Sequence, residues 1–116
     1  MNKFNDETKE IRTFYKDVKD ITCECENLIT ELTNKEIEFH NLKEKIFTKE
    51  QETIKKTDFN KLYGANNKDV RKQHLDKIMA EDYQTKQDLE FSIDYLKRRI
   101  SFLKAMTYMK IGGFPL

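Results

Sequence analysis

The stretch KLYGANNKDVRKQ, residues 61–73, decides the fold of this chain because it separates two long helical patterns. Gly64 suits the left-handed position that follows a helix, and Asn66 or Asn67 can cap the next helix with its side-chain oxygen. Just before the stretch, Asp58 can cap a short helical turn. Each special residue therefore has a structural role, and we expect the chain to reverse direction between about residues 57 and 66.

The segment before the turn has a heptad pattern. Counting sevens from Phe4 gives apolar residues or Cys at every a position, which are Phe4, Ile11, Val18, Cys25, Leu32, Phe39 and Ile46. The d positions are Phe14, Ile21, Leu28 and Leu42, interrupted by Glu7, Lys35 and Lys49. Thr33 and Glu36 form a capping-box pattern, yet the heptad phase continues through them without a shift. The pattern predicts one helix from about residue 6 to about residue 56.

A second helix is predicted after the turn, from about residue 67 to about residue 110. Its first half has a narrow apolar stripe of Leu75, Ile78, Met79 and Tyr83. Its second half has two stripes, which we place on adjoining faces. The first consists of Leu89, Ile93, Leu96, Ile100 and Leu103, and the second of Phe91, Tyr95, Phe102, Met106 and Met109. A helix that is apolar on two faces needs more than one partner.

The predicted fold is all-α, with two long antiparallel helices forming a helical hairpin or coiled coil in a single domain of 116 residues. We expect the second stripe to be the oligomer interface of a helical bundle, buried against another subunit. The alternative is that the first helix breaks and a monomer of three or four helices covers both stripes. The tail 111–116 contains two Gly and a Pro, so we expect it to be mobile or to dock through Phe114 and Leu116.

Composition and motifs argue against several classes of protein. The chain starts with polar and acidic residues and has no run of about 18 apolar residues, so we expect a cytoplasmic protein with no membrane contact. Cys23 and Cys25 point roughly 200° apart on a helix and can neither pair nor share a metal. The sequence has no Gly-rich phosphate loop, nucleophile elbow or metal-binding motif, so we expect no enzyme activity, no metal and no cofactor.

Charge is distributed unevenly along the sequence. Residues 1–60 carry eleven basic and fourteen acidic side chains, whereas residues 61–116 carry eleven and seven. Basic groups beside aromatics such as Tyr63, Phe102 and Tyr108 are suited to single-stranded nucleic acid, because phosphates meet the charges and bases stack on the rings. The candidate nucleic-acid-binding residues are Lys61, Lys68, Arg71, Lys72, Lys97, Arg98, Arg99 and Lys104. The structural alternative is that these cations complement helix C-termini without any ligand.

The arrangement Gly64-x-Asn66, followed by Arg71, Tyr83 and the helix LEFSIDYLKRRISFLKAM, resembles small coiled-coil proteins encoded in phage replication and recombination modules. The similarity covers roughly residues 60–110 and extends to phage recombination mediators. It implies an oligomer that binds single-stranded DNA, assists recombinase loading and acts in the host cytoplasm.

Two functional hypotheses follow. The first is a non-enzymatic, oligomeric accessory protein that contacts single-stranded DNA during replication or recombination. The second is a protein-binding module or inhibitor that engages a host protein, or a phage protein, through its C-terminal apolar helix face. Charge reversal at Arg98 and Arg99 should abolish the first function, whereas Phe91, Phe102 and Met106 should dominate the second.

Overall fold

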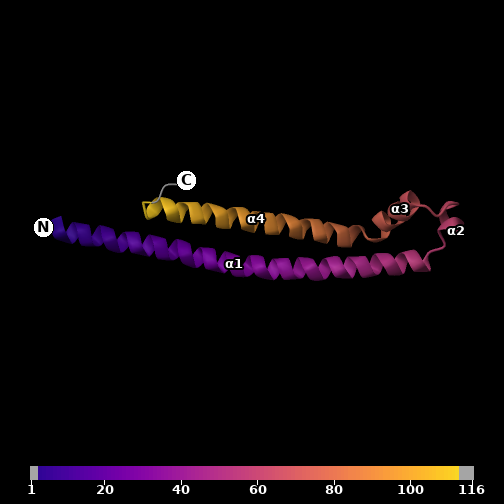
Figure 1. Ribbon diagram of the computed structural model, residues 1–116, viewed down its shortest axis with the longest axis horizontal. Coiled ribbons are helices and arrows are strands. Elements are labelled where there is room, and N and C mark those ends of the chain that lie inside the picture. The colour runs from indigo at the N-terminus through magenta and orange to yellow at the C-terminus, as the bar shows by residue number, and fades with distance from the viewer. Residues whose placement is uncertain (1–2, 113–116) are drawn as a thin grey trace. The chain divides into compact units, whose positions relative to one another are not determined.

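The protein is all-helical over residues 3–112, which are the residues that the structure, a computed structural model, describes. The helices are α1 (Lys3–Lys56), α2 (Phe59–Tyr63), α3 (Lys68–Ile78) and α4 (Ala80–Lys110), in the order shown in Figure 1. The predicted tail residues Phe114 and Leu116 lie outside the described residues.

Helix α1 is continuous, as predicted, and passes through Thr33 and Asn34 without a break. From Val18 onward its least exposed residues follow the expected alternation of three and four positions. They are Val18, Ile21, Cys25, Leu28, Leu32, Lys35, Phe39, Leu42, Ile46, Lys49 and Thr53, and only Glu50 and Ile54 are half-buried in addition to this series. The heptad prediction is therefore confirmed for this part of the helix. Further toward the N-terminus Ile11 and Phe14 are exposed, and the side chain of Phe4 is outside the described part of the chain.

Side-chain caps form the turn after α1. Asp58 accepts a hydrogen bond from the backbone N–H of Lys61 and so begins α2, at a distance of 3.1 Å. Gly64 ends α2 in the left-handed conformation, with φ of 74°. The amide oxygen of Asn67 then accepts from the N–H of Val70 and begins α3. The predictions for Asp58 and Gly64 are confirmed, and Asn67 rather than Asn66 is the cap.

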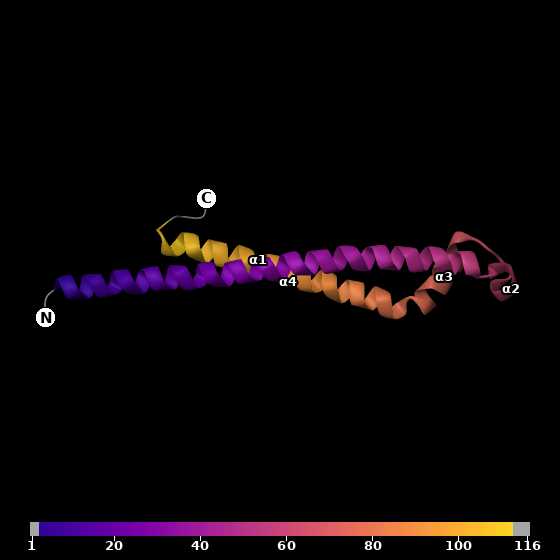
Figure 2. The same ribbon diagram turned by 90° about the horizontal axis from the view of Figure 1, so that it is seen from below.

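The predicted helix over residues 67–110 is divided in the structure at Met79, where the ribbon changes direction between α3 and α4 (Figures 1 and 2). Met79 has φ of −97° and ψ of 12°, in the bridge region that often ends a helical turn. Its side chain is buried with Ile46 and Leu75 in a small core, against which Tyr83 packs. Burial of this side chain accompanies the bend, and no Gly or Pro marks the position in the sequence.

The chain packs as two compact units. The terminal unit comprises residues 3–34 with 93–112, and the turn unit comprises residues 35–92. Each unit pairs a segment of α1 with a segment of α4. In an antiparallel helix pair only facing segments touch, so segments far apart along the helices share few contacts.

Within each unit the pairing is antiparallel. In the terminal unit Asp17 lies 3.6 Å from Lys110, and Glu24 lies 3.0 Å from Arg99. In the turn unit Lys49 pairs with Asp82, whereas Thr57 meets His74. The direction of pairing agrees with the predicted helical hairpin.

Candidate nucleic-acid interface and the outer face of α4

An aromatic cluster holds the turn in place. Phe59, only 2% exposed, stacks on Tyr63 with the ring centroids 6.2 Å apart and meets the edge of His74 at 5.3 Å. These three residues come from α2 and α3, so the cluster ties the two short helices together.

His74 joins this cluster to the end of α1. The hydroxyl of Thr57 donates its proton to the carbonyl of Thr53 at 2.7 Å, so it accepts from Nε2 of His74, 3.5 Å away. Nδ1 is then the acceptor for the hydroxyl of Tyr63, at 2.6 Å. This role of His74 was not predicted from the sequence, although two aromatics and a His around one turn were a signal that could have indicated it.

Basic side chains surround this fixed turn. We call Lys55, Lys56, Lys61, Lys68, Arg71 and Lys72 the turn cluster; all come from the end of α1, from α2 or from α3. Arg71 is half-buried and the others are exposed. Among the residues that the structure describes, none of the six forms an ion pair. Lys77 is placed differently, with its ammonium 5.9 Å from the ring centroid of Tyr63.

The C-terminal cluster, defined as Lys97, Arg98, Arg99, Lys104 and Lys110, has different electrostatic surroundings. Arg99 bonds to Glu24 at 3.0 Å, and its guanidinium lies 5.6 Å from the ring centroid of Phe102. Lys110 pairs with Asp17. The eight predicted nucleic-acid-binding residues therefore fall into two sets, one in each unit, and α1 partly neutralises the second set.

Helix α4 has apolar residues on two sides. The predicted inner stripe of Leu89, Ile93, Leu96, Ile100 and Leu103 is buried. We call the second stripe the outer face of α4; it comprises Phe91, Tyr95, Phe102, Met106 and Met109. Met106 is half-buried, and the other four are 54–67% exposed. The centres of the two stripes lie roughly 130° apart around the helix, and Met106, about 60° from Leu103, lies between them.

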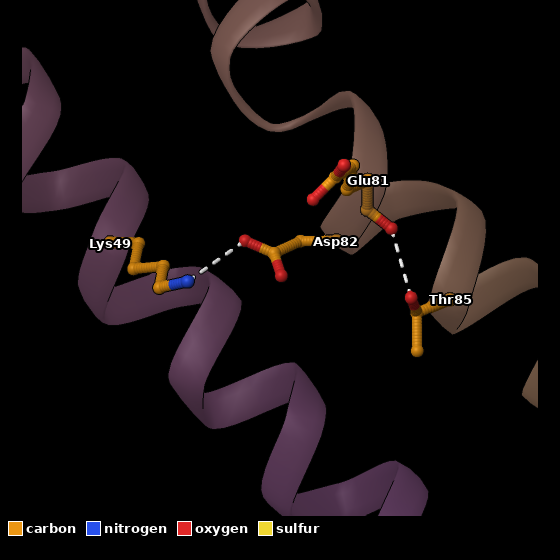
Figure 3. A network of polar contacts seen from close by, with 4 residues as sticks. All are labelled: Lys49, Glu81, Asp82 and Thr85. Atoms are coloured by element: carbon orange, nitrogen blue, oxygen red, sulfur yellow. Dashed lines mark hydrogen bonds and ion pairs between the residues drawn. The ribbon is translucent and has the colours of Figure 1, made fainter.

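The segments of α1 and α4 in the turn unit also make polar contacts. Lys49, at a d position, places its ammonium 3.0 Å from a carboxylate oxygen of Asp82, while Thr85 donates to the carbonyl of Glu81 (Figure 3). The hydroxyl of Tyr83 donates to Glu50 at 2.9 Å. Burial is the larger cause, and this hydrogen bond to a carboxylate the second, that raises the pKa of Tyr83 to about 12.

An open groove in the terminal unit combines apolar and polar groups. Its lining residues are Thr22, Cys25, Lys104, Thr107, Tyr108 and Ile111. Within residues 3–112, no three His, Cys, Asp or Glu side chains gather as a metal site would require. No helix of the described part has a stretch long and apolar enough to span a membrane.

Comparison with known proteins gives no family: no family model matches the chain, and neither a curated protein nor a solved structure is significantly similar to it.

Proposed function

We propose that this chain is a non-enzymatic, oligomeric accessory protein that contacts single-stranded DNA and assists replication or recombination in the cytoplasm. The observation that carries the proposal is the turn cluster, six basic side chains with no ion-pair partner among the described residues. Unpaired surface cations release counterions when they bind phosphates, and this drives binding without base specificity. The resemblance of residues 60–110 to phage recombination mediators supports the same proposal by analogy.

The aromatic cluster assists this function by fixing the backbone from which the cations project. The aromatic contacts of Phe59, Tyr63 and His74 hold α2 against α3. The basic side chains on these two helices are therefore attached to a fixed backbone. Tyr63 itself is occupied by His74 and Lys77. Binding at the turn cluster would therefore rest on phosphate contacts rather than on stacking of bases on this ring.

Binding to a labelled single-stranded oligonucleotide across a salt series tests the proposal. We expect binding at low salt that weakens steeply as salt rises. The double variant Lys61→Ala/Lys72→Ala should lower the logarithmic salt slope by about 1.4, since each phosphate contact on a single strand contributes about 0.7.

The matched control is Lys19→Ala/Lys45→Ala, which removes two exposed lysines of α1 that have no ion pair in the described residues. It should bind nearly as wild type does. Absence of binding at low salt, or equal loss in both double variants, would contradict the proposal.

The exposed outer face of α4 favours a second candidate function, a protein-binding module or inhibitor that engages a host protein. Its apolar residues would then dominate: Phe102→Glu should abolish function while Lys61→Ala/Lys72→Ala leaves it intact. The opposite result favours the DNA-associated function.

A further inference from the structure

Charge changes sign along α4. From Ala80 to Asp94 the helix carries five acidic side chains and one basic one. After Asp94 it carries five basic side chains and no acid, up to its end at Lys110. The helix is therefore acidic at one end and basic at the other, and three of these charges, Asp82, Arg99 and Lys110, already pair with side chains of α1.

A seam with heptad spacing runs along the outer face of α4 and includes every residue of that face except Met106. Alternating steps of three and four lead from Asp88 through Phe91, Tyr95, Arg98 and Phe102 to Ala105 and Met109. This is the spacing of a seam that packs against another helix. The inner face is already buried, so the partner of this second seam must come from outside the chain's own α1–α4 pairing.

We propose that the outer face of α4 packs against α4 of a second copy of this chain, antiparallel and around a two-fold axis. In this orientation Asp94 of each helix, which flanks the seam, lies beside Arg98 and Arg99 of the other helix, and both seams are covered. A parallel pair would instead place Arg98 against Arg98 and one basic half against the other. The charge pattern thus makes the helix complementary to itself in one orientation only.

The heptad spacing also defines a register. An axis between Leu96 and Lys97 pairs each a position with a d position of the other helix. Phe91 then faces Phe102 of the second copy, and Tyr95 faces its Arg98. Six aromatic side chains leave water in this arrangement, and at about 150–250 Å² for each whole side chain their exposed parts account for roughly 500–900 Å². The methionines and arginine stems bring the buried area near the roughly 1,000 Å² of a specific interface.

This inference rests on the oligomeric part of the proposed function and sharpens its DNA-binding part. Arg98 lies within the seam and would be covered by the second copy. The turn cluster is then the principal surface left for phosphates.

Mass in solution tests the association, by sedimentation equilibrium at tens of micromolar protein. Wild type should have twice the chain mass, and Phe102→Glu should have the mass of one chain. The control Tyr108→Glu changes another exposed aromatic of α4, 60% exposed and outside the seam, and should stay dimeric. Circular dichroism should show equal helix content in all three. A monomeric wild type, or a dimer that Phe102→Glu leaves intact, would overturn the proposal.

Disulfide formation tests the orientation. With Cys23 and Cys25 replaced by Ser, one chain carries Phe91→Cys and another carries Phe102→Cys. The mixture should oxidise to a cross-linked dimer, whereas either variant alone should not. Cross-linking of either variant to itself would show a parallel pair and overturn the orientation. DNA binding by the Phe102→Glu monomer is measured separately, so loss of the dimer and loss of the DNA-binding function are distinguishable.

Discussion

The turn cluster and the C-terminal cluster look alike in the sequence but differ in the structure. In the turn unit, the aromatic cluster holds the backbone, and neighbouring acids such as Asp58 and Asp69 form no ion pair with the six cations in the described residues. In the terminal unit, an acidic stretch of α1 lies along the basic end of α4, and Glu24 and Asp17 each engage one cation. The number of basic residues alone therefore overstates the anion-binding capacity of the C-terminal cluster.

The two regions also differ in how they are held together. The terminal unit buries a heptad-spaced row of α4, Ile93, Leu96, Ile100 and Leu103, together with Ile21 of α1. The turn has no repeat, and each of its contacts depends on one particular residue. A substitution at the turn should therefore lower the free energy of unfolding most strongly.

The largest effect is expected for Phe59→Ala. Truncating this buried ring leaves a cavity between α2 and α3, and removing a buried Phe costs about 3–5 kcal/mol. Urea unfolding measures the loss. The neighbouring residue Leu62 is exposed, so Leu62→Ala should change the free energy of unfolding by less than about 0.5 kcal/mol. A loss below about 1 kcal/mol for Phe59→Ala would mean that the turn does not depend on its aromatic cluster.

A smaller effect is expected for Tyr83→Phe, which removes the hydrogen bond to Glu50. At neutral pH the cost should be about 1–2 kcal/mol, because the acceptor is a carboxylate and the site is half-buried. The folded-state pKa is about 12, above the usual value of 10. The stabilising contribution is therefore fully present below pH 10 and is lost as the pH rises from 10 toward 12.

Thermal unfolding between pH 9 and pH 12 checks this sign. The difference in Tm between wild type and Tyr83→Phe should shrink across that window. Tyr15→Phe, at an exposed tyrosine without a hydrogen bond in the described residues, should show no such change. A constant difference for Tyr83→Phe would show that its hydroxyl does not stabilise the fold through Glu50.

The features that the sequence predicted correctly are those with local causes. Asp58, Gly64 and Asn67 act through their own side chains or φ angle on residues within three positions. The seams of α1 and α4 follow from a period that is visible within each segment.

The features that were missed depend on residues far apart in the sequence. Met79 is buried beside Ile46, which lies on another helix, so its local sequence shows no helix break. His74 has its role because the turn brings Tyr63 and Thr57 to its two ring nitrogens. Pairing of Arg99 with Glu24 likewise requires the register of α1 against α4, which neither helix contains alone.

The smallest expected effect concerns this pair, and it tests the contrast between the two clusters directly. The ion pair is largely exposed, so a double-mutant cycle on Glu24 and Arg99 should give a coupling energy of about 0.2–1 kcal/mol. Replacing Glu24 with Gln releases the guanidinium of Arg99 without removing any basic residue. If α1 neutralises the C-terminal cluster, Glu24→Gln should raise the affinity for single-stranded DNA about two- to threefold at low salt. The gain should vanish near 1 M salt, where screening is nearly complete.

The control is Glu52→Gln, at an exposed acid of α1 that has no ion pair in the described residues and belongs to the turn unit. If Glu52→Gln raises the affinity and Glu24→Gln does not, the turn cluster is the one limited by neighbouring acids, and the contrast between the clusters is reversed.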